Sequence, residues 1–91
     1  MPTAYPEVLR NVLTSVEQLK LARIAIDDLK AALWEASRVI SSHEERELRQ
    51  YFQWAEGKLD MIQSTVSSED AFPEALKIAQ GVEDQVNRAL G

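Results

Sequence analysis

The sequence predicts an all-α protein, an antiparallel three-helix bundle with one long N-terminal helix, built as a single helical domain over residues 1–91. Its composition is 45% hydrophobic with only three glycines and three prolines, which is typical of compact helical proteins. Apolar residues recur at alternating spacings of three and four in three segments, as on one face of a helix. Capping or turn residues separate the segments, so each is expected to form its own helix.

The first helix is expected from about residue 6 to residue 40. Pro6 suits the first helical position, and Glu7 suits the first turn, where the helix dipole favours an acid. Capping-box patterns at residues 14–18 would start a new helix there. The apolar heptad does not slip across them, so we favour one continuous helix. Its expected core residues are Val8, Val12, Leu19, Ala22, Ile26, Leu29, Leu33, Ala36 and Ile40.

Two shorter helices are expected after this one, at about 43–66 and 73–90. The heptad phase slips near Ser41, and Ser42 with Glu45 forms a capping box for the second helix. A polar turn follows, and Pro73 fits the start of the third helix. Such short connections make consecutive helices antiparallel neighbours. The expected core residues are Leu48, Phe52, Ala55, Leu59, Ile62 and Val66 in the second helix, and Leu76, Ala79, Val82, Val86 and Ala89 or Leu90 in the third.

The three predicted helices differ in length, and this difference predicts an interface. At 1.5 Å per residue the first is about 50 Å long, the second about 36 Å and the third about 27 Å. Residues 6–15 would therefore overhang and expose an apolar patch. Further apolar residues widen the second side of the first helix and the stripe of the second helix. The predicted partner or self-association interface consists of Val8, Leu9, Val12, Leu13, Leu21, Ile24, Trp34, Tyr51, Trp54 and Met61.

Two other readings of the aromatic residues remain open. Trp34, Tyr51 and Trp54 could pack within the monomer, or they could line a small-molecule pocket between helices. Gly57 and Gly81 either permit another helix to approach closely or are tolerated at solvated positions, at a cost near 1 kcal/mol in a helix.

The sequence contains no recognisable catalytic, cofactor-binding or metal-binding motif. Cysteine is absent, His43 is the only histidine, and no EF-hand spacing occurs, so no metal site and no cofactor are expected. The expected function is that of a non-enzymatic protein–protein interaction module, such as a small adaptor, regulator or inhibitor. A protein partner and self-association, with a homodimer favoured, are the expected interactions.

The charge distribution bears on the kind of partner. The net charge is -5, and residues 41–91 hold five basic and ten acidic side chains. Because such a surface repels phosphate backbones, no nucleic-acid partner is expected. An alternative function is an acidic inhibitor or antitoxin-like protein that masks a basic site. No segment approaches the roughly 20 apolar residues of a membrane span, and no secretory signal is evident, so no membrane partner and a cytoplasmic location are expected.

The outline of one long helix followed by two shorter ones resembles the all-helical chorismate mutases. This resemblance implies a remote alternative, a small enzyme whose active site is lined by arginine, lysine and a late glutamine. Arg10, Arg38, Arg49 and Gln85 occupy comparable stretches of this chain. The family's Arg-Glu-Glu motif is replaced by Glu-Glu-Arg-Glu at residues 44–47. Two aspartates, at positions 27 and 28, stand where the family has a basic residue.

Overall fold

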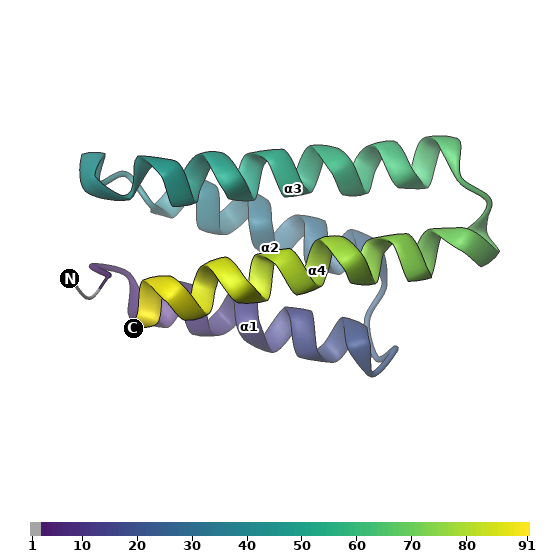
Figure 1. The fold of residues 1–91 in the computed structure, drawn as a ribbon, viewed down its shortest axis with the longest axis horizontal. Coiled ribbons are helices and arrows are strands. Elements are labelled where there is room, and N and C mark those ends of the chain that lie inside the picture. Colours follow the sequence, from purple (N-terminus) through teal and green to yellow (C-terminus); the bar gives the residue numbers. More distant parts are fainter. Residues whose placement is uncertain (1–2) are drawn as a thin grey trace.

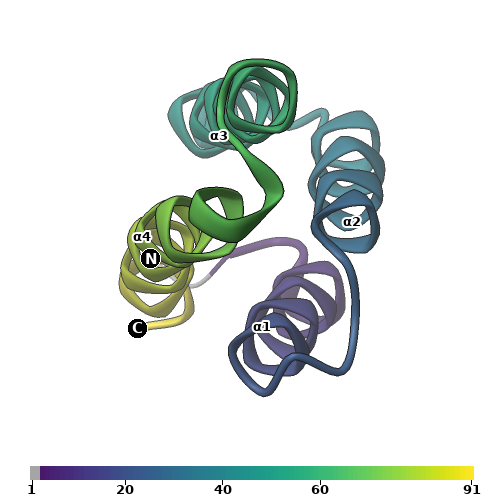
Figure 2. The ribbon, with the colours of Figure 1, turned by 90° about the vertical axis from the view of Figure 1, so that its right-hand side faces the viewer.

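The computed structural model describes residues 3–91, apart from the side chain of Ser68. The described chain is all-helical, with no strand. Four α-helices run alternately up and down: α1 (Pro6–Lys20), α2 (Ile26–Val39), α3 (Arg46–Thr65) and α4 (Ser68–Leu90). A single 3₁₀ turn, η1 (His43–Glu45), lies between α2 and α3. Viewed from the side the helices are antiparallel, and viewed along the bundle α4 closes it by lying beside α1 (Figures 1 and 2).

The core lies along the axis of the bundle and takes one apolar stripe from each helix. Phe52 is the largest fully buried side chain, and α4 contributes mostly small residues that allow close packing. Most of the core residues expected from the helical periodicity are buried or partly buried, but Ala22 is exposed. The buried members of the core are Leu9, Val12, Val16, Leu19, Leu29, Leu33, Ala36, Ile40, Phe52, Ala55, Leu59, Ala75, Ala79, Val82 and Val86. No helix among the described residues is long and apolar enough to cross a membrane.

The prediction of one continuous helix over residues 6–40 is wrong, and the domain is therefore a four-helix bundle. The helix passes unbroken through the capping boxes at residues 14–18, as expected, but it ends at Lys20. The Ala22 N–H donates to the Leu19 carbonyl at 2.9 Å, and the Arg23 N–H donates to the Gln18 carbonyl at 2.9 Å. This pair of hydrogen bonds is a Schellman motif, in which the chain reverses after a residue in the left-handed conformation.

The residues in this turn are not those that usually end and begin helices. Ala22 has φ +56°, in the left-handed position that glycine normally occupies. Ala25 stands at the N-cap of α2 and has no side-chain acceptor for the first helical N–H groups. Asp28 compensates in part, because its carboxylate accepts the Ala25 N–H at 2.9 Å. The break is therefore imposed by packing of α1 against α2 and α4 and was not evident from local sequence.

We expect Ala22→Gly to raise the free energy of unfolding by about 1 kcal/mol. Glycine adopts positive φ without the clash between Cβ and the following carbonyl. Urea unfolding followed by circular dichroism measures the change. Ala31→Gly, at an exposed position inside α2, is the matched control and is expected to lower stability by about 1 kcal/mol. A loss of stability in both variants would contradict the left-handed conformation at Ala22.

The predicted start of the last helix at residue 73 is also wrong, because α4 begins at Ser68. The Ser67 carbonyl accepts the N–H groups of Asp70 and Ala71, at 3.0 and 2.8 Å. Pro73 lies inside the helix, where it cannot donate to the carbonyl of Glu69. Pro73 and Glu69 are both exposed, so water can satisfy that carbonyl, while the buried Ala71 holds the first turn against the bundle.

Candidate interaction surfaces

The structure separates the predicted interface residues into three groups. Leu9 and Val12 lie in the core, with 0% and 1% of their surface exposed. Val8, Leu13, Ile24 and Tyr51 are partly buried against that core, whereas Leu21, Trp34, Trp54 and Met61 are exposed. The expected overhang of residues 6–15 is therefore wrong. Because the long helix is broken, α1 folds back and is covered by both α2 and α4.

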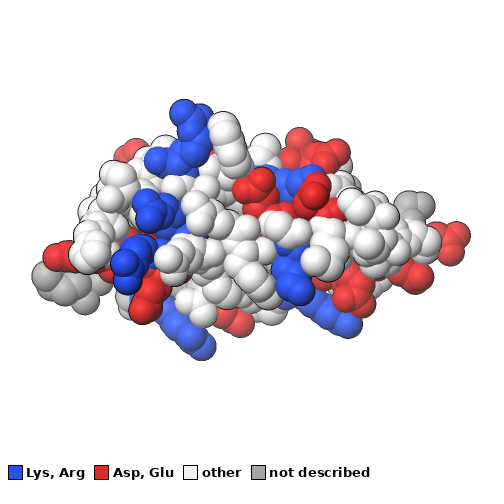
Figure 3. Space-filling view, turned by 90° about the horizontal axis from the view of Figure 1, so that it is seen from above, with Lys and Arg blue, Asp and Glu red and all other residues white. Residues whose placement is uncertain are grey.

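Two large apolar side chains, Trp54 and Met61, are exposed on the side of α3 that faces away from the core. Their exposed fractions are 48% and 54%. They belong to a row of exposed residues with successive spacings of four, three, four and three, the spacing with which one helix packs along another. We name this row the α3 outer face; it consists of Gln50, Trp54, Gly57, Met61 and Ser64. Figure 3, which views the molecule from the α3 side, shows uncharged surface interspersed with basic and acidic side chains, including a mixed cluster near the middle.

Trp54 has contacts that favour one orientation of its ring. The ring centroids of Tyr51 and Trp54 are 5.4 Å apart at an interplanar angle of 45°. The Lys58 ammonium lies 5.9 Å from the Trp54 ring centroid, within the range of a cation–π contact. Aromatic pairs and cation–π contacts contribute about 0.5–1.5 kcal/mol each. The exposed indole is therefore partly preorganised.

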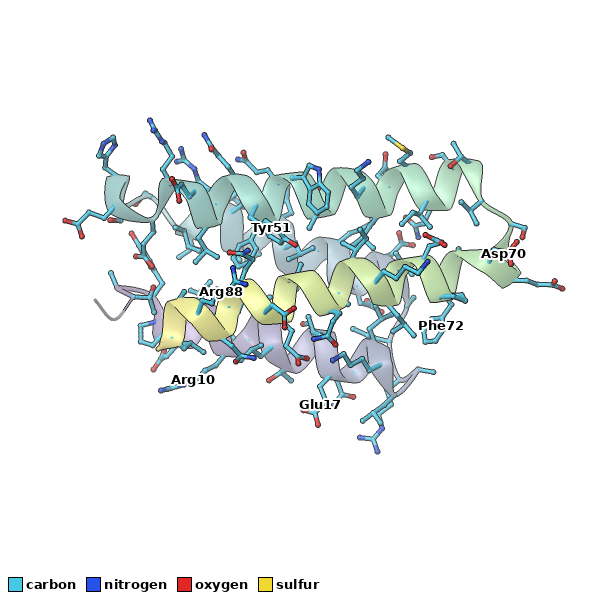
Figure 4. The ribbon with its side chains drawn as sticks, in the orientation of Figure 1. Arg10, Glu17, Tyr51, Asp70, Phe72 and Arg88 are labelled. Carbon is cyan, nitrogen blue, oxygen red and sulfur yellow. The ribbon has the colours of Figure 1, made fainter. Side chains whose placement is uncertain are left out.

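Tyr51 itself is positioned by the close approach of α3 and α4. It extends from α3 toward α4 beside Arg88 (Figure 4). A Cβ atom added at Gly81 would collide with the Tyr51 hydroxyl. Gly81 therefore leaves room for the tip of the Tyr51 side chain, which would have to shift if a Cβ atom were present. At Gly57, in contrast, an added Cβ would meet nothing within 4 Å.

The two tyrosines are expected to titrate in separate steps. Hydrogen bonding from Ser41 lowers the pKa of Tyr5 below 10, whereas burial, helped by the nearby Asp84, raises the pKa of Tyr51 above 10. Ultraviolet absorbance against pH measures both, and Tyr51→Phe should leave only the lower step. Because the Tyr51 pKa is raised, its contribution to stability is complete below pH 10 and is lost as pH rises through its folded-state pKa. A single step at the ordinary pKa would contradict these environments.

Trp34 forms a second exposed aromatic site, on α2. Its ring lies under the Arg38 guanidinium, 4.6 Å from Cζ to the ring centroid, and its carbonyl accepts a hydrogen bond from the Ser37 hydroxyl at 2.8 Å. Arg38 also pairs with Glu35 at 3.6 Å. Among the described aromatic rings, only Tyr51 and Trp54 form a ring pair, with tilted planes, so the two tryptophans do not form a joint aromatic cluster. Val39 is 41% exposed and was missed by the sequence interpretation.

Two hollows lie away from both tryptophans. One, of about 290 Å³, is a mostly apolar groove between α1 and α2, with Val8 and Val39 at one end and Ser15 and Ala32 at the other. The other, of about 590 Å³, lies at the end of the bundle where the N-terminal segment meets α3 and α4. Neither is lined by Trp34 or Trp54. Tyr51, however, lines the larger hollow, so of the three aromatics for which the sequence allowed a small-molecule pocket only Tyr51 borders one of these two hollows.

The lining of the end cavity is about half polar and half apolar, and its polar part is rich in acids. Glu44, Glu45 and Glu47 line it together with Gln85 and Arg88. The Glu45 carboxylate accepts hydrogen bonds from the Thr3 hydroxyl and from the Ala4 N–H, the latter at 3.2 Å, so it fastens the N-terminal segment over this end. The described residues contain no group of three or more histidine or acidic side chains arranged to hold a metal ion.

The positions of the charged side chains bear on the two alternative functions considered from the sequence, a chorismate-mutase-like enzyme and an acidic inhibitor. Gln85 lines the end cavity, but Arg10, Arg38 and Arg49 do not, and Arg10 lies on α1 away from Arg88 (Figure 4). The three-helix outline that resembled the chorismate mutases is itself replaced by four helices. Several of the acids instead make ion pairs within the bundle: Glu83 with Lys20 at 2.6 Å, Asp60 with Lys30 at 2.9 Å and Glu74 with Lys77 at 3.3 Å.

Comparison of the chain with protein-family models, with curated proteins and with solved structures found no match. The interpretation of function therefore depends on the surfaces described above.

Proposed function

We propose that the chain is a non-enzymatic protein-binding module that holds an amphipathic helix of a partner protein along the α3 outer face. The observation that carries this proposal is Trp54, which is half exposed while Tyr51 and Lys58 contact its ring. Tryptophan and tyrosine are enriched at binding hot spots. A side chain that is already ordered loses less conformational entropy when a partner binds.

The shape of the face favours a helical partner. The four-three-four-three spacing places a continuous seam along α3, and Gly57 leaves an opening in it between Trp54 and Met61. A small residue in such a seam lets a second backbone approach closely, and the neighbouring large side chains then pack into the partner's grooves. Within the isolated chain this glycine only weakens the helix. Its position is therefore best explained by an external contact.

The charge at the edge of the face favours an acid on the partner. Lys58 lies over Trp54 and takes part in none of the ion pairs found among the described residues. Asp60, in contrast, is already paired with Lys30. A partner carboxylate next to Lys58 would therefore complete a charge pair and fix the register of the bound helix.

Alanine substitution of the two tryptophans tests the proposal. The immobilised chain is used to capture proteins from native lysate, and the affinity of each captured protein is then measured with purified components. Trp54→Ala is expected to weaken binding about 30-fold, the loss of a hot spot worth about 2 kcal/mol. Trp34→Ala is the matched control, because Trp34 is equally exposed on another helix, at 49%. Equal affinities in the two variants would contradict binding through the α3 outer face.

Gly57→Lys is expected to have opposite effects on stability and on binding. Lysine is a better helix former and meets open space in the isolated chain, so the free energy of unfolding should rise by about 0.5–1 kcal/mol. The long side chain would fill the opening in the seam and abolish partner binding. Urea unfolding measures the expected gain in stability, and the affinity measurement tests the expected loss of binding. Retained affinity in the stabilised variant would show that no partner approaches Gly57.

A further inference from the structure

The connection between α1 and α2 is a strained turn built from residues that favour a helix. We propose that two copies of the chain exchange α1 through this turn. In the exchanged dimer, α1 of each copy packs against α2 and α4 of the other, and α1 and α2 of one copy join as a single helix through residues 21–25. The partner in this interaction is a second copy of the same chain.

The first argument is the chemistry of the turn. Ala22 has φ +56° at the Schellman position, where a Cβ atom is unfavourable, and Ala25 provides no side-chain cap for α2. Both penalties exist only while the turn is closed. In a continuous helix Ala22 would take the ordinary helical conformation, and α2 would need no cap at Ala25.

The second argument is that the turn has high helix propensity. Residues 21–25 read Leu-Ala-Arg-Ile-Ala, with no glycine, proline or polar capping residue. Leucine, alanine and arginine are among the best helix formers. The apolar heptad also continues across the turn, through Leu19, Ala22 and Ile26. Local helix propensity therefore favours the open form, whereas packing within one chain and the hydrogen bond from the Ala25 N–H to Asp28 favour the closed form.

The third argument is that exchange keeps the contacts of α1. The α1–α2 and α1–α4 packing and the Lys20–Glu83 ion pair at 2.6 Å are recreated between chains. In the closed chain α1 and α2 are antiparallel neighbours (Figures 1 and 2). Two opened chains can therefore place their joined helices side by side about a two-fold axis near the turn. The balance between the two forms then depends on the turn and on the concentration of the chain.

Chemical cross-linking between singly substituted chains tests the exchange directly, because the chain has no cysteine. The Tyr5 and Ser41 hydroxyls are 3.3 Å apart in the closed chain, at the ends of α1 and α2 remote from the turn. Tyr5→Cys and Ser41→Cys chains are unfolded together, refolded at high concentration and treated with a short bis-maleimide. Exchange predicts a cross-linked dimer in the mixture and none with either variant alone. A wild-type dimer that gives no such cross-link, or a mixture that remains monomeric, overturns the proposal.

Variants of the turn supply the second measurement. Ala22→Gly with Ala25→Asp stabilises the closed turn and weakens the continuous helix, so the dimer dissociation constant should rise at least about 100-fold. Deletion of residues 22–24 leaves too short a connection for reversal and should give an obligate dimer of unchanged helicity. Light scattering after size-exclusion chromatography measures both. An unchanged dissociation constant in the first variant overturns the proposal even if the deletion variant does not fold. The α3 outer face is unaltered in both, so failure here leaves the proposed partner binding intact.

Discussion

Phe52→Ala is expected to lower the free energy of unfolding by about 3–5 kcal/mol. Phe52 is fully buried on α3 and is the largest side chain in the core. Its removal loses the transfer free energy of the ring and leaves a cavity that a four-helix bundle closes only in part. Domains of this size are stable by about 5–15 kcal/mol, so the variant should be close to unfolding at room temperature. Urea unfolding followed by circular dichroism measures the change.

The matched control for this variant is Trp54→Ala, two residues further along the same helix. Trp54 is larger than Phe52, but about half of its surface is exposed, and it contacts only the edge of the bundle. Its loss should cost about 1 kcal/mol, mainly from the tilted ring contact with Tyr51. Equal losses in the two variants would mean that α3 is rotated from the orientation described here.

Helical periodicity predicted the core well because burial on a helix is a local property of the sequence. Leu29 and Leu33 on α2, and Val82 and Val86 on α4, are buried as their spacing indicated. The slip of the heptad phase near Ser41 also predicted the turn between α2 and α3. These features follow from side-chain spacing alone, and the tertiary structure confirms them.

The break after Lys20 could not be predicted in this way. The turn has no glycine or proline, and its residues favour a helix, so every local signal opposed a reversal. The chain reverses because the break lets α1 fold back, so that α1 and α2 bury their apolar stripes within one chain. The start of α4 was mispredicted at Pro73 for the same reason, because burial of Ala71 in the bundle favours a helix start before the proline.

The exposed site was predictable in part. The sequence predicted an interface that includes Trp54 and Met61, and both side chains are exposed. It could not distinguish Gly81, which accommodates Tyr51, from Gly57, which faces open space. That distinction depends on a contact between α3 and α4 and therefore required the tertiary structure.

Leu9→Glu is expected to unfold the chain, because Leu9 is fully buried between α1 and the rest of the bundle. Among the described residues, a carboxylate at this position would lie in the apolar core without a cationic partner. Burying an unpaired charge costs several kcal/mol. The three-helix interpretation instead placed Leu9 in an exposed overhang, where a carboxylate would meet water. Leu21→Glu is the control, since Leu21 is 53% exposed and should change stability by less than about 0.5 kcal/mol. Circular dichroism of the purified variants distinguishes the two outcomes: a folded, monomeric Leu9→Glu chain would restore the overhang and refute the position of α1 in the bundle.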